Sequence, residues 1–214
     1  MRMTRDDVQQ SLTRLRTADP NLEYHGANSH GYRLHPPLSE TEVVSVEERL
    51  GVRLPAEYRE FVTLIGDGGA GPGFGLHSLR ELLAKGAKAR RKSREDLADP
   101  SRPFGRPTTV RESSRLGEFP THGVIALCEM GCGGAYGLVT AGLERGWIWC
   151  VDTIGEYAPA SRENPIYFAG ASAEDRLRIN EEFHAGQLAI SNRERLGFWA
   201  WYRLWLEGRI GASA

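Results

Sequence analysis

The stretch SETEVVSVEERLGVRLPAEYREFVTLIGDGG, residues 39–69, decides the fold of the N-terminal half. It opens with Ser39 and Glu42, a capping box in which the serine oxygen accepts the N3 amide while the glutamate reaches back to the N-cap amide. Apolar residues then recur at helical spacing until Gly51 ends the helix. Pro55 opens a second amphipathic helix, because its missing N–H is not needed in the first turn. The stretch therefore predicts a helical hairpin that buries both apolar stripes against the rest of the chain.

One more helix and an arm are predicted before this hairpin. Thr4 and Asp7 mark the start of the helix, and Asp19-Pro20-Asn21 ends it. Glycine and proline mark residues 23–37 as an extended arm. No carboxylate lies among the three histidines of this arm, so we expect them to be solvated or hydrogen-bonded rather than to bind metal: His25, His30 and His35.

A glycine-rich loop follows the hairpin, with six glycines among residues 66–75. It is not a phosphate-binding loop, because it follows a helix, lacks a Gly-Lys-Ser/Thr ending and contains Asp67, which would repel an anion. We expect a structural turn or a partner contact. The next predicted helix contains six Lys or Arg among residues 85–94, which could be a solvated helix face, a docking site for an acidic protein or a weak nucleic-acid footprint.

The C-terminal half changes to strand periodicity. Short apolar runs at 124–128, 135–140 and 147–151 are separated by glycine-rich turns, which predicts an antiparallel meander. A helix from Ser172 to His184 and a final helix over about 192–207 are expected to follow. This order predicts the α+β class, with N-terminal helices, an antiparallel β-meander and a C-terminal aromatic helix packed on the sheet.

The final predicted helix contains more tryptophan side chains than one helix face can bury. Trp199 and Trp201 lie about 200° apart on a helix, so they and Trp205 cannot all face one core. We expect one of the three to be partly exposed or covered by the N-terminal arm.

Composition limits the class of function. The 214 residues hold 27 Lys or Arg and 28 Asp or Glu, a net charge of −1 that argues against wholesale nucleic-acid binding. No apolar run reaches the ~20 residues of a membrane span, and we find no secretory signal. Three cysteines suit reduced thiols. We therefore expect a cytoplasmic protein with no membrane partner.

The sequence holds no convincing catalytic or metal-binding set. Cys128, Cys132, Cys150 and His122 could be drawn as a zinc site, but structural zinc sites use tighter paired spacings. We find no nucleophile elbow, and the adjacent glutamate pairs on the predicted helices would not converge on one bond. We therefore expect no metal, no cofactor and no enzymatic activity, and keep an enzyme or zinc protein built on the cysteines as the weakest alternative.

Two motifs resemble the SUKH superfamily, the Smi/Knr-like proteins. The first is Glu-x-x-Leu-Gly followed by Leu-Pro-x-x-Tyr-x-x-Phe and a Gly-Gly turn, which extends from Pro36 through residues 46–61 to Gly69. The second is the terminal Phe-x-x-Trp-Tyr-x-x-Trp-Leu of residues 198–206. On this basis we expect residues 1–35 to be an N-terminal helix and arm, and 36–210 a SUKH-like domain with a basic, proline-punctuated insert at about 85–120.

The resemblance implies a protein-binding domain without catalytic residues. Bacterial members are thought to be immunity proteins that block polymorphic toxins, and eukaryotic relatives act as regulators. We therefore expect an immunity protein that binds a toxin domain, with a cytoplasmic adaptor for a non-toxin partner as the alternative. Loops at the ends of elements carry function more often than core positions do, which suggests these contacts: Asp67, Phe74, Glu129, Asp152, Lys88, Arg90 and Arg91.

Overall fold

The computed structural model describes residues 2–83, 98–105, 107, 116, 119–131, 133–151, 157–160 and 194–208. The elements, in chain order, are helices α1 (Arg5–Ala18), α2 (Ala27–His30), α3 (Glu40–Leu50) and α4 (Ala56–Leu64), strands β1 (Val124–Gly131), β2 (Gly134–Val139), β3 (Ile148–Val151) and β4 (Tyr157–Pro159), and helix α8 (Phe198–Leu206). The α+β class predicted from the sequence is confirmed. Within the described ranges, no helix is both long and apolar enough to cross a membrane.

The N-terminal helices begin where their caps predict. Thr4 and Asp7 form a capping box at α1, and Ser39 with Glu42 forms one at α3. Gly51 ends α3 in the left-handed conformation, with φ +69°. The arm differs from the prediction, because it contains the short helix α2 between two left-handed glycines.

The sheet is an antiparallel meander in the order β1-β2-β3-β4. It extends the three predicted runs by the short strand β4, which the sequence patterns did not reveal. Tyr136 contacts Trp201 of α8 (5.3 Å between ring centroids), whereas Trp149 contacts Phe104 (4.9 Å). Because Trp149 pairs with Gly137, the neighbour of Tyr136, these aromatic contacts lie on opposite faces of the sheet. Both faces are therefore covered, which explains why β2, β3 and β4 are buried along their whole lengths.

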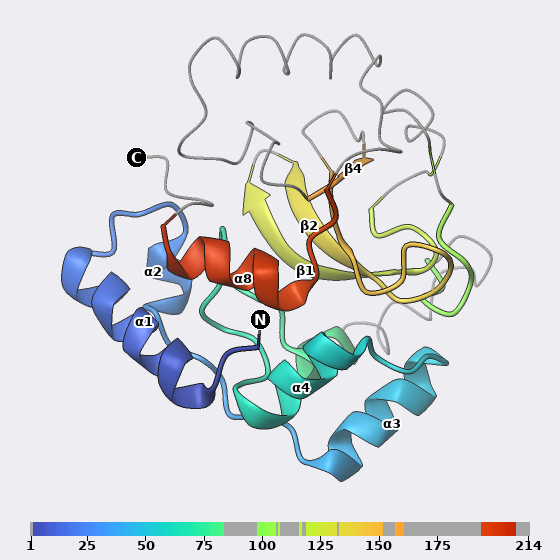
Figure 1. Cartoon of the computed structure of the whole chain (residues 1–214), viewed down its shortest axis with the longest axis horizontal. Helices are drawn as coiled ribbons and strands as arrows, with labels where there is room; N and C mark the ends of the chain where they lie inside the picture. The colour runs from blue at the N-terminus through green and yellow to red at the C-terminus, as the bar shows by residue number, and fades with distance from the viewer. Residues whose placement is uncertain are drawn as a thin grey trace, which may run out of the picture.

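Helix α8 forms a middle layer between the sheet and the N-terminal helices (Figure 1). Phe61 of α4 packs against the rings of Phe198 and Tyr202, while Trp201 packs on the sheet. All three tryptophans of this helix are buried, and Trp205 is only 7% exposed. The sequence allowed either an exposed tryptophan or one covered by the arm, and the second outcome is the one observed. Trp205 is covered by the arm, where the His30 ring lies 5.8 Å from it edge-on.

The buried apolar side chains form one core that includes the N-terminal residues Met3, Val8 and Leu12. The proposed boundary between residues 35 and 36 stays a prediction. Of the helix expected after the glycine-rich loop, the structure describes residues 79–83 as helical. The basic run and the helix expected from Ser172 to His184 lie outside the described residues.

Candidate functional site

The glycine-rich loop of residues 66–76 is buried except at its tip. Phe74 is 47% exposed, whereas every other residue of the loop is buried. Such burial is possible because the backbone is hydrogen-bonded on several sides: the Tyr202 hydroxyl donates to the Ala70 carbonyl (2.9 Å), and Gly69 pairs with Leu76. The loop is thus a rigid element of the core that exposes one aromatic side chain.

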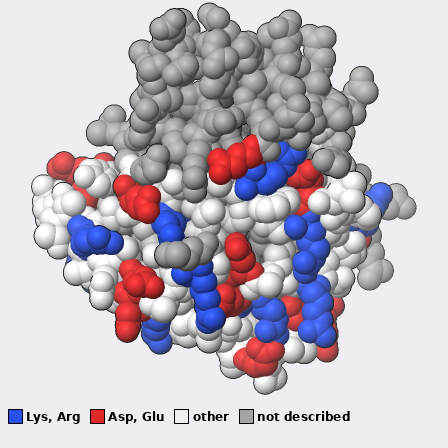
Figure 2. Space-filling model, in the orientation of Figure 1, with Lys and Arg blue, Asp and Glu red and all other residues white. Residues whose placement is uncertain are grey.

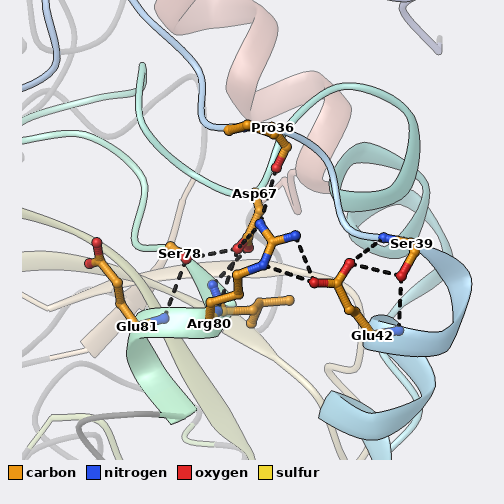
Figure 3. A network of polar contacts seen from close by, with 8 residues as sticks. Pro36, Ser39, Glu42, Asp67, Ser78, Arg80 and Glu81 are labelled. Carbon is orange, nitrogen blue, oxygen red and sulfur yellow. Dashed lines mark hydrogen bonds and ion pairs between the residues drawn. The ribbon is translucent and has the colours of Figure 1, made fainter.

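Asp67 does not lie on the surface, so the expectation that it is an exposed contact is wrong. Its carboxylate is fully buried and accepts hydrogen bonds from the Ser78 hydroxyl (2.7 Å) and the Leu79 amide (2.8 Å). Figure 3 shows these bonds at the start of the helical residues 79–83. A carboxylate there satisfies amides that have no partner within the helix. Asp67 therefore holds the end of the loop.

Arg80 extends this network to helix α3 (Figure 3). Its guanidinium lies 3.5 Å from the Asp67 carboxylate and donates to Glu42 at 2.8 Å. The Ser39 amide and hydroxyl, followed by Arg80, lower the pKa of Glu42 to about 2. The loop, the start of α3 and the start of helix 79–83 are thereby joined through one network of hydrogen bonds and ion pairs.

Close backbone approach fixes the tip of the loop against the arm and β1. A Cβ built on Gly26 would lie 1.9 Å from the Gly73 carbonyl oxygen, and one on Gly73 would lie 2.2 Å from the Glu129 carbonyl oxygen. The Phe74 amide donates to that same Glu129 oxygen (2.9 Å). Only glycine permits three chain segments to meet this closely. In Figure 1 the end of β1 points toward this tip of the loop and toward α2.

The result is an exposed cluster at the β1–β2 hairpin, which we call the hairpin patch: His25, Phe74 and Glu129. The His25 ring lies 5.5 Å from the Phe74 ring, and its Nε2 lies 2.6 Å from the Met130 carbonyl oxygen. The Phe74 ring also covers Gly131, where an added Cβ would approach it to 3.4 Å. Two of the residues predicted from the sequence, Phe74 and Glu129, thus lie together on the surface. His25 was not among the predicted contacts. Its imidazole is hydrogen-bonded, which is one of the two states expected for the histidines of the arm.

A second exposed apolar position lies at the other end of β2. Leu143, in the turn between β2 and β3, is 80% exposed, and Trp147 after it is 37% exposed. Apolar side chains without a neighbour are common on surfaces and need no functional explanation. Because Leu143 is also an exposed apolar side chain, it provides a matched comparison for Phe74.

Acidic and basic side chains are interspersed over the helical face of the molecule (Figure 2).

The buried ionisable groups of the described chain have structural partners. Asp19 accepts from the Tyr32 hydroxyl at 2.7 Å, and burial, followed by this carboxylate, raises the pKa of Tyr32. Glu47 accepts from the Leu54 amide (2.9 Å), and Glu144 binds Arg195 (2.6 Å). Each of these carboxylates is already engaged in holding segments together.

The cysteines and His122 are placed as follows. Cys128 and Cys150 are unbridged thiols buried in β1 and β3, and the Cys150 thiol donates to the Ala158 carbonyl (3.3 Å). Burial raises the pKa of the Cys128 thiol far above its usual range. His122 Nδ1 accepts from the Asp99 amide (3.0 Å), and its Nε2 lies 3.1 Å from the Arg102 guanidinium. Cys132 lies outside the described residues, as do the predicted contacts Asp152, Lys88, Arg90 and Arg91.

The sequence model of a known protein family matches this chain. The sequence model of the SMI1 / KNR4 family (SUKH-1) matches residues 37–180, which is 144 of the 214 residues. The matched region extends from just before α3 through the whole sheet. A search of curated proteins finds no match.

Proposed function

The chain belongs to the SMI1 / KNR4 family (SUKH-1), and from this membership we propose that it is an immunity protein, a non-catalytic domain that neutralises a bacterial toxin by covering it. The observation that carries the proposal is the hairpin patch, in which Phe74 alone emerges from a buried loop. A large aromatic side chain held in place makes a good interface anchor, because little conformational entropy is lost when it is covered. Glu129 is exposed and is joined to Phe74 by a backbone hydrogen bond, so the same patch carries a negative charge.

A binding role without catalysis fits the chemistry of the buried polar groups. Asp67 caps a helix, and Glu47 and Glu144 each bind an arginine. The Cys128 thiol is buried and its pKa is raised, so it is a poor nucleophile at neutral pH. These groups stabilise the fold, and the exposed Phe74 is left to meet a partner.

Coexpression with the toxin domains encoded beside the gene tests the proposal. Wild-type protein is expected to restore growth of cells that express one of these domains and to bind that domain in calorimetry. Phe74→Ser is expected to weaken binding by about thirtyfold, which is about 2 kcal/mol at an interface anchor. Leu143→Ser removes a similarly exposed apolar side chain from the opposite end of β2 and is expected to bind like wild type.

Each of the following results would contradict one part of the proposal. Absence of binding and protection with every neighbouring toxin domain refutes the immunity role, and a stable cellular partner found instead indicates the adaptor alternative. If a toxin is bound but Leu143→Ser weakens the complex while Phe74→Ser does not, the interface lies at the β2–β3 turn. Turnover of any toxin substrate by the immunity protein alone would contradict the non-catalytic role.

A further inference from the structure

A groove of about 740 Å³ lies between helix α1 and residues 32–37. One wall is a single stripe of α1, with Arg5, Gln9 and Arg16 at helical spacing. Apolar side chains that are almost fully buried form its base: Leu12, Tyr32 and Ile65. The groove is thus apolar at its base and polar along its rim.

The rim is cationic and unpaired. Arg5, Arg16 and Arg33 line the groove, are exposed, and make no ion pair with any described residue. No Asp or Glu is among the lining residues. Elsewhere on the described chain, Arg59 and Arg80 are matched with carboxylates. In a chain of net charge −1, this collection of unmatched guanidinium groups is a local excess of positive charge.

The groove also contains an open backbone edge. The His35 amide donates to the Gly68 carbonyl (3.0 Å), and the Ala70 amide donates to the Arg33 carbonyl (2.8 Å). In this antiparallel pattern, the N–H and C=O of Leu34 point away from the loop. Neither group has a hydrogen-bond partner within the described chain. An extended peptide can add to such an edge as a short strand.

We propose that this groove binds an extended acidic segment of a partner protein. Carboxylates of the segment pair with Arg5, Arg16 and Arg33, its backbone pairs with Leu34, and an apolar side chain covers the base. Guanidinium groups favour carboxylates because two parallel N–H···O bonds can form. A single-stranded nucleic acid fits less well, because its bases stack best on exposed Tyr, Phe or Trp rings. Tyr32 of this groove is 6% exposed, and the exposed ring of the lining is the smaller imidazole of His35. The proposal is independent of the hairpin patch and holds whether or not the partner is a toxin.

Fluorescence anisotropy with the full chain and two labelled octapeptides tests the groove. One peptide alternates glutamate and valine between terminal glycines, and the other replaces each glutamate by glutamine. The acidic peptide is expected to bind at least tenfold more tightly. Arg16→Gln and Arg33→Gln are each expected to weaken its binding by about tenfold. Arg53→Gln, an equal charge change at an exposed site outside the groove, is expected to stay within twofold of wild type.

Four results would overturn the assignment or one part of it. Equal binding of the two peptides excludes carboxylate recognition, and an equal loss in Arg53→Gln indicates non-specific charge attraction. Tighter binding of a twelve-residue oligothymidine, weakened by the same groove variants, assigns the site to nucleic acid instead. In titrations followed by NMR, the amide of Leu34 is expected to shift with the acidic peptide, and an unshifted amide excludes strand addition.

Discussion

Replacing Asp67 with alanine is expected to destabilise the fold by about 3 kcal/mol, because three donors each lose a hydrogen-bond acceptor at about 1 kcal/mol. The carboxylate is fully buried and binds the Ser78 hydroxyl and the Leu79 amide at 2.7 and 2.8 Å. The Arg80 amide is the third donor to this carboxylate, at 3.4 Å. Each buried donor left without a partner adds about 1 kcal/mol at the lower end of its range. Asp67→Asn keeps one acceptor oxygen and is expected to lose about half as much.

Urea unfolding followed by tryptophan fluorescence measures this loss. With a slope of about 2 kcal/mol per molar urea, the alanine variant is expected to unfold at a urea concentration about 1.5 M below wild type. Glu129→Ala removes a carboxylate that is exposed and is expected to stay within about 0.5 kcal/mol.

A wild-type midpoint for Asp67→Ala would refute the structural role. If that variant also lost partner binding, Asp67 would act as a contact residue, as the sequence alone suggests. A loss of stability with unchanged slope and retained secondary structure would confirm that the carboxylate holds the loop to helix 79–83.

Three further variants test other parts of the fold by the same unfolding measurement. Burial lowers the pKa of His30 from 6.5 to about 4, and the neutral ring accepts from the Tyr32 amide through Nδ1. The stability that neutral His30 contributes is therefore present above pH 6.5 and is lost as the pH falls toward 4. Over that range, the difference in unfolding free energy between wild type and His30→Gln is expected to narrow by up to about 2 kcal/mol, and a constant difference would contradict this. Gly73→Ala places a Cβ 2.2 Å from a carbonyl oxygen and is expected to lose at least 1 kcal/mol more than Gly31→Ala, which has a similar φ and open space around it; equal losses would exclude the close approach as the cause. Tyr202→Phe removes a buried hydrogen bond to the loop and is expected to lose about 1 kcal/mol, whereas a wild-type midpoint would show that this bond does not stabilise the loop.

Local signals predicted the secondary structure well. The capping boxes at Thr4 and Ser39 and the left-handed Gly51 act within a few residues, so their outcome is visible in the sequence. The meander followed from short apolar runs joined by short turns. Strand β4 was not predicted, because three residues are too few for a pattern that distinguishes a strand from a loop.

The sequence was wrong or undecided where distant segments meet. Asp67 lies between glycines, which is typical of an exposed turn, and only the fold brings Ser78 to its carboxylate. Trp205 is buried because the arm returns to cover it through His30, an outcome that helical periodicity alone left as one of two possibilities. Phe74 and Glu129 could be named separately from the sequence, but their adjacency depends on a backbone hydrogen bond between a loop and a strand.

The glycines of the buried loop would favour tight binding at the small surface that we propose as the interface. A flexible loop that carried Phe74 would have to be ordered when the partner binds, at about 1–2 kcal/mol per residue. Here the close approach of Gly26, Gly73 and the β1 backbone orders the loop during folding instead. The association rate of a preorganised patch should depend little on the aromatic side chain, so Phe74→Ser is expected to act mainly by accelerating dissociation. A slower association rate with unchanged dissociation would mean that the loop rearranges on binding, which would contradict the rigid presentation of Phe74.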